Sequence, residues 1–274
     1  MNFEIKDGVL VKYTGNTPDV IIPSDVTAIG ESAFEDCKNL EKIEIPKSVT
    51  KIGEFAFLQC DSLRKIVIPE SVTTIDGFAF DSCYNLNEIV IPESVTTIGD
   101  GAFDVTKWLE NKMATEKNVV IVNGIVISRA NNIEESVNLE GVKEILTGIF
   151  LNCNEIKEFI VSDGTKIGFN AFFTRNTFNI CLKHDDFSVN IPVKESEIES
   201  YWFTERTQSL FDFIGAGLAQ KELLFDELEI PEYRYPIALF MANAYDSEFF
   251  KAFVDVHFEK IREYAKNNDH DLLK

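Results

Sequence analysis

A sequence motif that recurs every 23 residues constrains the fold of this chain more than any other feature. The pair Ala-Phe returns at this interval, at Ala33-Phe34, Ala56-Phe57, Ala79-Phe80 and Ala102-Phe103. Proline keeps the same interval at Pro23, Pro46, Pro69 and Pro92, and cysteine does so at Cys37, Cys60 and Cys83. Because several residue types share one period, we expect the chain to stack copies of one structural unit as a solenoid.

One copy of the unit shows how each coil is built. Ile43 and Ile45 alternate with Lys42 and Glu44, which is the period of a half-buried strand. Pro46 ends this strand because it has no amide hydrogen to give to a strand ladder. Successive coils are therefore expected to place their strands side by side, about 4.8 Å apart, in a single curved sheet.

The repeated apolar positions predict the interior. Phenylalanine accounts for 23 of the aromatic residues, against 7 tyrosines and 2 tryptophans. Six of these residues are expected to form a spine of rings, namely Phe34, Phe57, Phe80, Phe103, Phe150 and Phe172. The chain has 5 cysteines but no C-x-x-C spacing. We therefore expect the cysteines to be buried, reduced thiols that pack as small apolar groups, rather than metal ligands or disulfide partners.

A third repeated position carries mostly glycine. It is occupied by Gly30, Gly53, Asp76, Gly99 and Gly168. Aspartate tolerates the left-handed backbone region better than most residues do. The position is therefore predicted to be a turn with positive φ.

A second, longer internal repeat extends the array beyond the first four copies. Residues 3–37 align with residues 119–153, and each stretch opens with alternating apolar residues around a two-residue turn. The turns, Asp7-Gly8 and Asn123-Gly124, predict two β-hairpins. The first hairpin, within residues 1–15, is expected to cap the open end of the solenoid. The second falls within an irregular insertion at about residues 105–135, and the repeats end near residue 182.

The last quarter of the chain has a different pattern. Residues 183–195 are predicted to be a linker, and residues 196–274 show helical spacing of apolar residues. A helix is expected to open at Pro236, and the clearest helix runs from Asp246, a plausible N-cap, to about Lys266. The fold class is therefore α+β, a solenoid followed by a small helical domain that covers its end.

The repeated pattern resembles a known family. The stretch from Leu40 to Cys60 has the pattern L-x-x-I-x-I-P-x-S-V-T-x-I-G-x-x-A-F-x-x-C. This pattern is similar to the leucine-rich repeat of the BspA-like bacterial proteins. The resemblance covers residues 1–182. It implies a right-handed leucine-rich-repeat solenoid that presents a sheet to partners, and it implies no catalytic residues.

Charge and hydropathy exclude several classes of partner. The net charge of −20 repels a phosphate backbone, so no nucleic-acid partner is expected. No apolar run approaches the length of a membrane span, and the amino terminus lacks the pattern of a signal peptide. These features predict a cytoplasmic protein without membrane contact, with the cell surface as the alternative if another route exports it.

No motif for catalysis, phosphate binding or metal binding occurs in the sequence. G-x-S-x-G, the P-loop, G-x-G-x-x-G and H-E-x-x-H are all absent. His184-Asp185-Asp186 is the best metal-like cluster, but consecutive residues do not converge on one ion. His257 falls on the apolar face of a predicted helix, which is typical of a core histidine. We therefore expect no catalytic residue, no metal and no cofactor.

The outward positions of the predicted sheet are the candidate binding surface. Charged and apolar side chains form two columns there, at Lys42, Glu44, Lys65, Val67, Glu88, Val90, Glu158 and Ile160. An apolar stripe rimmed by charge favours contact with a protein. The leading hypothesis is a non-enzymatic module that binds an unidentified protein partner. The alternatives are a structural spacer or self-associating element, and adhesin-like binding as in the secreted members of the family. Valine also suits strands without any binding role, and the oligomeric state stays open.

Overall fold

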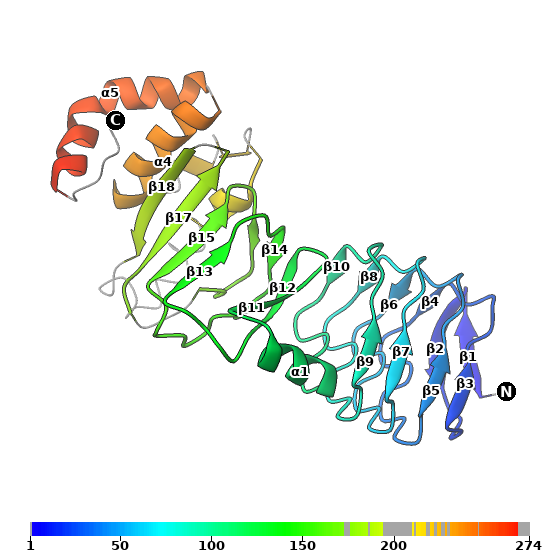
Figure 1. The fold of residues 1–274 in the computed structure, drawn as a ribbon. Coiled ribbons are helices and arrows are strands. Elements are labelled where there is room, and N and C mark those ends of the chain that lie inside the picture. Colours follow the sequence, from blue (N-terminus) through cyan, green and yellow to red (C-terminus); the bar gives the residue numbers. More distant parts are fainter. Residues whose placement is uncertain are drawn as a thin grey trace. The chain divides into compact units, whose positions relative to one another are not determined.

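The computed structural model divides into two compact units (Figure 1). The first comprises Met1–Asn123 and Ile127–Asn132, and the second comprises Gly124–Val126 and Ile133–Lys274. The structure describes residues 2–172, 176–185, 187–193, 210, 212–217, 220–221, 224–225, 228, 231–245 and 247–267.

The first unit is built from coils of very short strands. Each coil contributes one strand to each of two faces. The strands are β1 (Phe3–Lys6), β2 (Val9–Tyr13), β3 (Asp19–Ile21), β4 (Ala28–Ile29), β5 (Lys42–Glu44), β6 (Lys51–Ile52), β7 (Lys65–Val67), β8 (Thr74–Ile75), β9 (Glu88–Val90) and β10 (Thr97–Ile98).

The solenoid is confirmed, but the expectation of a single sheet is wrong. One face is a continuous sheet in the order β1-β2-β4-β6-β8-β10, and the opposite face holds the separate pairs β3-β5 and β7-β9. The second ladder arises because each coil has two short apolar segments on either side of its proline. In register, Ile52 of β6 pairs with Ile75 of β8, and Ile66 of β7 pairs with Ile89 of β9.

The phenylalanine spine lies at the centre of the first unit. Phe34, Phe57, Phe80 and Phe103 are buried, and their successive ring centroids lie 5.0, 5.1 and 5.8 Å apart. The rings are almost parallel, with interplanar angles of 6°, 2° and 2°. The 23-residue period therefore stacks identical side chains one coil apart, as the sequence predicts.

Two of the cysteines, Cys60 and Cys83, pack beside this spine. All five are free, and Cys60 and Cys83 donate from Sγ to the backbone carbonyls of Phe34 and Phe57, at 3.1 and 3.0 Å. The hydrogen-bonded contact with the Cys83 thiol, together with burial, raises the pKa of Cys60. Cys60, Cys83 and Cys153 are buried, as the sequence predicts, but Cys37 and Cys181 are only half-buried, so the expectation that all five are buried is wrong for these two.

The repeated glycine position does not adopt the positive φ that the sequence predicts. Its five residues are all described, and none enters the left-handed region. Glycine is needed there because adjacent coils touch through their backbones. A Cβ built on Gly53 would lie 2.8 Å from the Gly30 carbonyl carbon and 2.9 Å from the Ile29 oxygen. Positive φ occurs two residues later instead, at Ser32, Phe55, Phe78 and Gly101.

The structure contains both hairpins that the sequence predicts. Strand β1 pairs antiparallel with β2, and Asp7 and Gly8 both have positive φ, as a tight two-residue turn requires. The insertion contains the helix α1 (Lys107–Thr115), in which the side chain of Thr106 caps the amide of Leu109. The strands β11 (Val119–Val122) and β12 (Ile125–Arg129) follow, with Asn123 and Gly124 at the turn.

The second unit is also built from coils of short strands. Its strands are β13 (Ser136–Leu139), β14 (Glu144–Ile145), β15 (Glu158–Ser162), β16 (Lys166–Ile167), β17 (Phe178–His184) and β18 (Phe187–Val193). One face is the sheet β13-β15-β17-β18, and on the other β12, through Ile125 and Val126, pairs with β14, which in turn pairs with β16. Phe150, Phe159 and Phe172 pack together in its core.

The predicted linker over residues 183–195 is wrong for most of its length. Residues Phe187–Val193 form β18, which pairs antiparallel with β17 from Phe178↔Val193 to His184↔Phe187. The polar residues of this stretch misled the prediction, because they alternate with Val189 and Ile191, which are buried. The boundary between the two units accordingly lies at the second hairpin, and the helices belong to the same unit as the last coils.

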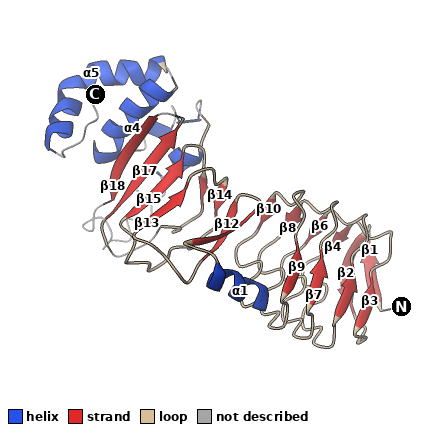
Figure 2. Ribbon diagram, viewed as in Figure 1, coloured by secondary structure: helices blue, strands red, loops and turns tan. Residues whose placement is uncertain are grey.

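Two long helices follow in the described part of the second unit. They are α4 (Pro231–Ala244), which packs against β18, and α5 (Glu248–Asn267), as Figure 2 shows. Pro236 lies inside α4 rather than at its start, and Pro231 opens the helix, where a missing amide hydrogen costs nothing. The predicted N-cap Asp246 and residues 194–209 lie outside the described residues.

Candidate functional site

The outward positions of β5, β7 and β9 form one surface in the first unit. Ile43, Ile66 and Ile89 point into the core, and the residues that flank each of them are exposed. This alternation follows from the pleat of a strand, which sends neighbouring side chains to opposite faces. Six of the eight residues predicted as a binding surface lie here: Lys42, Glu44, Lys65, Val67, Glu88 and Val90.

Charge on this surface is arranged in local pairs. Lys42 donates to Glu44 on the same strand at 2.9 Å, and Lys65 donates to Glu88 on the next coil. The hydrogen bond that Lys42 donates to Glu44 raises the pKa of Lys42. Both pairs are exposed to solvent and contribute little to stability. They are therefore available to a partner that exchanges these contacts for its own.

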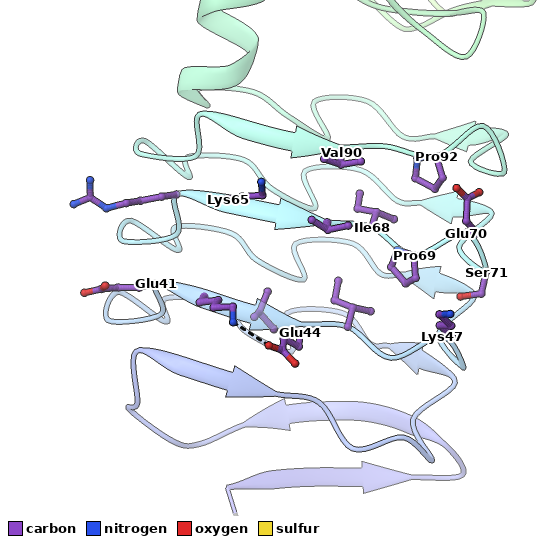
Figure 3. A pocket seen from close by; sticks show the side chains of 15 residues that line it. Glu41, Glu44, Lys47, Lys65, Ile68, Pro69, Glu70, Ser71, Val90 and Pro92 are labelled. Carbon is purple, nitrogen blue, oxygen red and sulfur yellow. Dashed lines mark hydrogen bonds and ion pairs between the residues drawn. The ribbon is translucent and has the colours of Figure 1, made fainter.

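An apolar groove lies on the same face. Its volume is ≈ 850 Å³, and Figure 3 shows the side chains that line it. Its apolar wall includes Ile45, Val67, Ile68, Pro69, Val90 and Pro92. Val67 and Val90 are 52% and 45% exposed, and they are register partners in the β7-β9 pair. Val67 and Val90 of the predicted apolar stripe thus lie side by side on this surface, but its third member, Ile160, does not.

The strand ladder of this face is interrupted beneath the groove. Between β3 and β5, the Glu41 amide donates to Pro18, and the Ile22 amide donates to Glu44. Between β7 and β9, one pair of coils further on, the Asn87 amide donates to Arg64, and the Ile68 amide donates to Val90. The equivalent bonds between β5 and β7 would be Arg64 to Glu41 and Ile45 to Val67. Within residues 41–69, all of which are described, neither bond forms.

This interruption explains a residue that the sequence placed wrongly. Ile45 was expected to point into the core, but it is half-buried and lines the groove. Its equivalents Ile22 and Ile68 are each only 2% exposed. All three share the same local motif, so sequence alone could not single out Ile45. What distinguishes Ile45 is the missing pairing between β5 and β7, which is a property of the two coils and not of the local motif.

The remaining two predicted surface residues do not belong to this site. Glu158 and Ile160 lie on β15 in the second unit, and both are half-buried. Ile160 lies between its register partners Asn138 and Cys181, and Glu158 accepts from the Ser136 hydroxyl at 2.8 Å. Because β15 is flanked by strands on both sides, its outward residues are more enclosed than those of β7.

A polar cluster in the second unit has a structural role. The Lys221 ammonium lies 3.0 Å from the Asp163 carboxylate and donates to the carbonyls of Ile214, at 2.8 Å, and Phe213. Burial lowers the pKa of Lys221, and Asp163 opposes this effect. Because these three acceptors use all three ammonium hydrogens, Lys221 has no N–H group left to donate to a substrate. Asp163 also accepts from the Tyr245 hydroxyl.

The two histidines among the described residues, His184 and His257, occupy packed positions. His184 Nδ1 lies 3.2 Å from the Tyr245 hydroxyl, and His257 Nδ1 lies 3.0 Å from the Phe253 carbonyl. Among the described residues, no group of three or more His, Cys, Asp or Glu side chains is placed to hold a metal. A search of the described helices for a segment of membrane-spanning length and hydropathy finds none.

Comparison with known proteins identifies the repeat. The model of the BspA type leucine rich repeat region matches residues 4–134 and 111–210, in 6 copies. A search of the curated proteins finds no match.

Several solved structures are similar at low identity. The leucine-rich repeat protein TpLRR of T. pallidum is 24% identical over 61% of this chain and 78% of its own, with a TM-score of 0.37. A leucine-rich repeat protein from Bacteroides ovatus is 20% identical over 66% of this chain and 68% of its own, with a TM-score of 0.36. The pneumococcal vaccine antigen PcpA is 19% identical over 60% of this chain and 50% of its own, with a TM-score of 0.37.

Proposed function

The chain belongs to the family of BspA-type leucine-rich repeat proteins, and we propose that it is a non-enzymatic module that binds a protein partner through the face formed by β5, β7 and β9. The observation that supports this proposal most strongly is the apolar groove of ≈ 850 Å³ on that face, rimmed by charged side chains. Apolar surface surrounded by a polar rim is the usual anatomy of a protein interface.

The shape of the site favours a protein over a small polar molecule. The groove crosses the strands of several coils and is lined mostly by apolar side chains. Its charged residues stand along the strands, as Lys42 and Lys65 do, and do not converge on one point. A site for a small polar ligand would need a few polar groups that converge within a concave pocket.

The proposal is tested by charging the two exposed valines. Val67→Glu combined with Val90→Glu places two carboxylates in the apolar part of the groove, where a partner would have to bury them. We expect this variant to lose the partner proteins that the unaltered chain captures from a lysate of its source organism. Its melting temperature should not change, because both side chains are about half exposed.

A matched control makes the same change elsewhere in the first unit. Val11→Glu combined with Ile121→Glu also places two charges at exposed apolar positions, which are 40% and 47% exposed. Val11 lies on β2, in the opposite ladder, so this control should keep its partners. Equal capture by the two double variants would exclude the β5-β7-β9 face as the interface. A molar mass above that of one chain in light scattering, without any partner, would favour the self-associating alternative.

A further inference from the structure

A stacked pair of phenylalanines forms a second candidate contact surface in the first unit, apart from the groove. Phe55 and Phe78 lie in the turns that follow β6 and β8, and their rings stack 5.4 Å apart with an interplanar angle of 10°. We infer that this pair, with the carboxylates beside it, binds an arginine side chain of a basic protein segment. The inference goes beyond the proposed function, because it assigns a second surface and the chemical group that this surface accepts.

The turns themselves do not require these two rings. The same position in the neighbouring coils carries Ser32 and Gly101. All four residues have positive φ, and this backbone region is rare for a bulky side chain. The buried phenylalanine spine already fills the interior of these coils. Phe55 and Phe78 therefore add aromatic surface at a place where neither the turn nor the core calls for it.

The stack of rings ends after two members. The next coil has Gly101 at the position where the repeat would place a third ring. Among the described rings, Phe78 therefore stacks on Phe55 alone, and it is 36% exposed. A Cβ built on Gly101 would lie 2.5 Å from Cε1 of Phe78, so a side chain at this position would displace the ring. A flat group from a partner can cover the exposed part of Phe78 and extend the stack.

Carboxylates border the exposed ring. The Cβ built on Gly101 also lies 3.2 Å from Oδ2 of Asp104, so this carboxylate and the edge of the Phe78 ring border the same small space. Asp81 belongs to the turn that begins at Phe78, because its amide donates to the Phe78 carbonyl at 3.1 Å. Burial, and then the negative charges of Asp81 and Asp100, raises the pKa of Asp104. A cation beside the ring would relieve the repulsion among these three carboxylates.

An arginine side chain suits this combination better than a lysine side chain does. A guanidinium group is planar and stacks on an aromatic face, while its N–H groups lie in its own plane and reach carboxylates beside the ring. Carboxylates accept such N–H groups in pairs. The ammonium group of lysine is a compact charge that has no flat face. The net charge of −20 also attracts a basic segment over a longer range.

The probe is N-acetyl-arginine methylamide, titrated into the full chain and followed by NMR of the backbone amides and the phenylalanine rings. The matched control ligand is N-acetyl-citrulline methylamide, which has nearly the same shape but no charge. We expect the arginine probe to shift the Phe78 ring and the Asp104 amide with half-saturation at about 1–10 mM, as suits so small a ligand. The citrulline probe should bind at least about fivefold more weakly, because it lacks the cation.

Two substitutions separate the role of the ring from that of the charge. Phe78→Leu keeps an apolar side chain without an aromatic face, and Asp104→Asn removes one carboxylate. Each should weaken binding of the arginine probe about fivefold. Phe78→Tyr keeps the ring and should retain the affinity. Glu93→Gln, the matched control, removes an exposed carboxylate from the turn that follows β9. At about 0.15 M salt it should leave the affinity unchanged, because exposed charges that are far apart are screened. Thermal melts confirm that each variant is folded.

Three results would overturn the inference. The first is equal binding of the arginine and citrulline probes, and the second is an unchanged affinity in Phe78→Leu or in Asp104→Asn. The third concerns the variant that combines Val67→Glu with Val90→Glu, which alters only β7 and β9 and should bind the arginine probe normally. If this variant loses the probe, the arginine binds in the groove and the inference fails, while the proposed function stands. If it loses its protein partners but keeps the probe, the two surfaces are separate, as inferred.

Discussion

Phe57→Ala removes the ring that the structure places at the centre of the phenylalanine spine. This side chain is fully buried, and its ring lies between those of Phe34 and Phe80, with centroids 5.0 and 5.1 Å away. Because neighbouring coils meet above and below the ring, the surrounding structure has little freedom to collapse into the space that is left. The variant therefore leaves a cavity in the middle of the first unit.

The magnitude follows from burial and stacking. Replacement of a buried phenylalanine by alanine costs about 3–5 kcal/mol of unfolding free energy. Each aromatic pair contributes about 0.5–1.5 kcal/mol beyond area burial. Phe57 has stacked neighbours on both faces, so we expect a cost near the upper end, about 5 kcal/mol. The control is Phe78→Ala, which removes the same atoms from a ring that is 36% exposed and stacks on Phe55 alone among the described rings. We expect it to cost about 2 kcal/mol.

The assay is urea unfolding of both variants, followed by far-ultraviolet circular dichroism, with thermal melts alongside. At about 2–4 °C per kcal/mol for a domain of this size, the melting temperature of Phe57→Ala should fall by about 10–20 °C. Phe57→Leu fills most of the cavity and should recover more than half of the loss. If Phe57→Ala and Phe78→Ala are equally destabilising, the inner stack does not carry the stability assigned to it here.

Three further predictions concern the glycine position, the thiols and Tyr245. Gly53→Ala should cost about 2 kcal/mol in urea unfolding, because its Cβ meets the backbone of the preceding coil; an unchanged midpoint would show that the coils can move apart. In the folded chain, a thiol reagent should modify at most Cys37 and Cys181, while all five cysteines react in denaturant; a third thiol modified under native conditions would contradict the buried ladder. Burial, and then the hydrogen bond to Asp163, raises the pKa of Tyr245 above its usual 10.0. The unfolded chain therefore loses this proton first, so stability from this group is present below pH 10 and falls as the pH rises further. Tyr245→Phe should flatten that fall in unfolding experiments between pH 9 and 11, and an identical pH profile would argue against the buried contact.

The sequence predicts the parts of this fold that follow from the repeat. One period places Phe34, Phe57 and Phe80 in a column, and it places Cys60 and Cys83 in another. Hairpins at Asp7-Gly8 and Asn123-Gly124 are equally predictable, because these dipeptides favour the backbone conformation of a two-residue turn. These are local preferences copied at a fixed interval.

Other features depend on contacts that the period does not encode. Phe187–Val193 was predicted to be a linker, but it becomes a strand because β17 offers an open edge beside it. The glycines of the repeat were predicted to make a turn, but they are required by the approach of the next backbone. The pairing of Lys221 with Asp163 joins residues 58 positions apart, and no sequence pattern indicates it.

The candidate site likewise combines features that the sequence predicts with features that only the tertiary structure shows. From the sequence alone, Lys42, Lys65, Val67 and Val90 could be assigned to an outward face, because alternation along a strand determines which side chains leave the core. Only the tertiary structure shows that the ladder opens between β5 and β7 and exposes Ile45 there. The coils carry nearly the same motif, so their sequences predict the same strand. Whether two such strands bond depends on the distance between coils, which the packing of the whole stack decides.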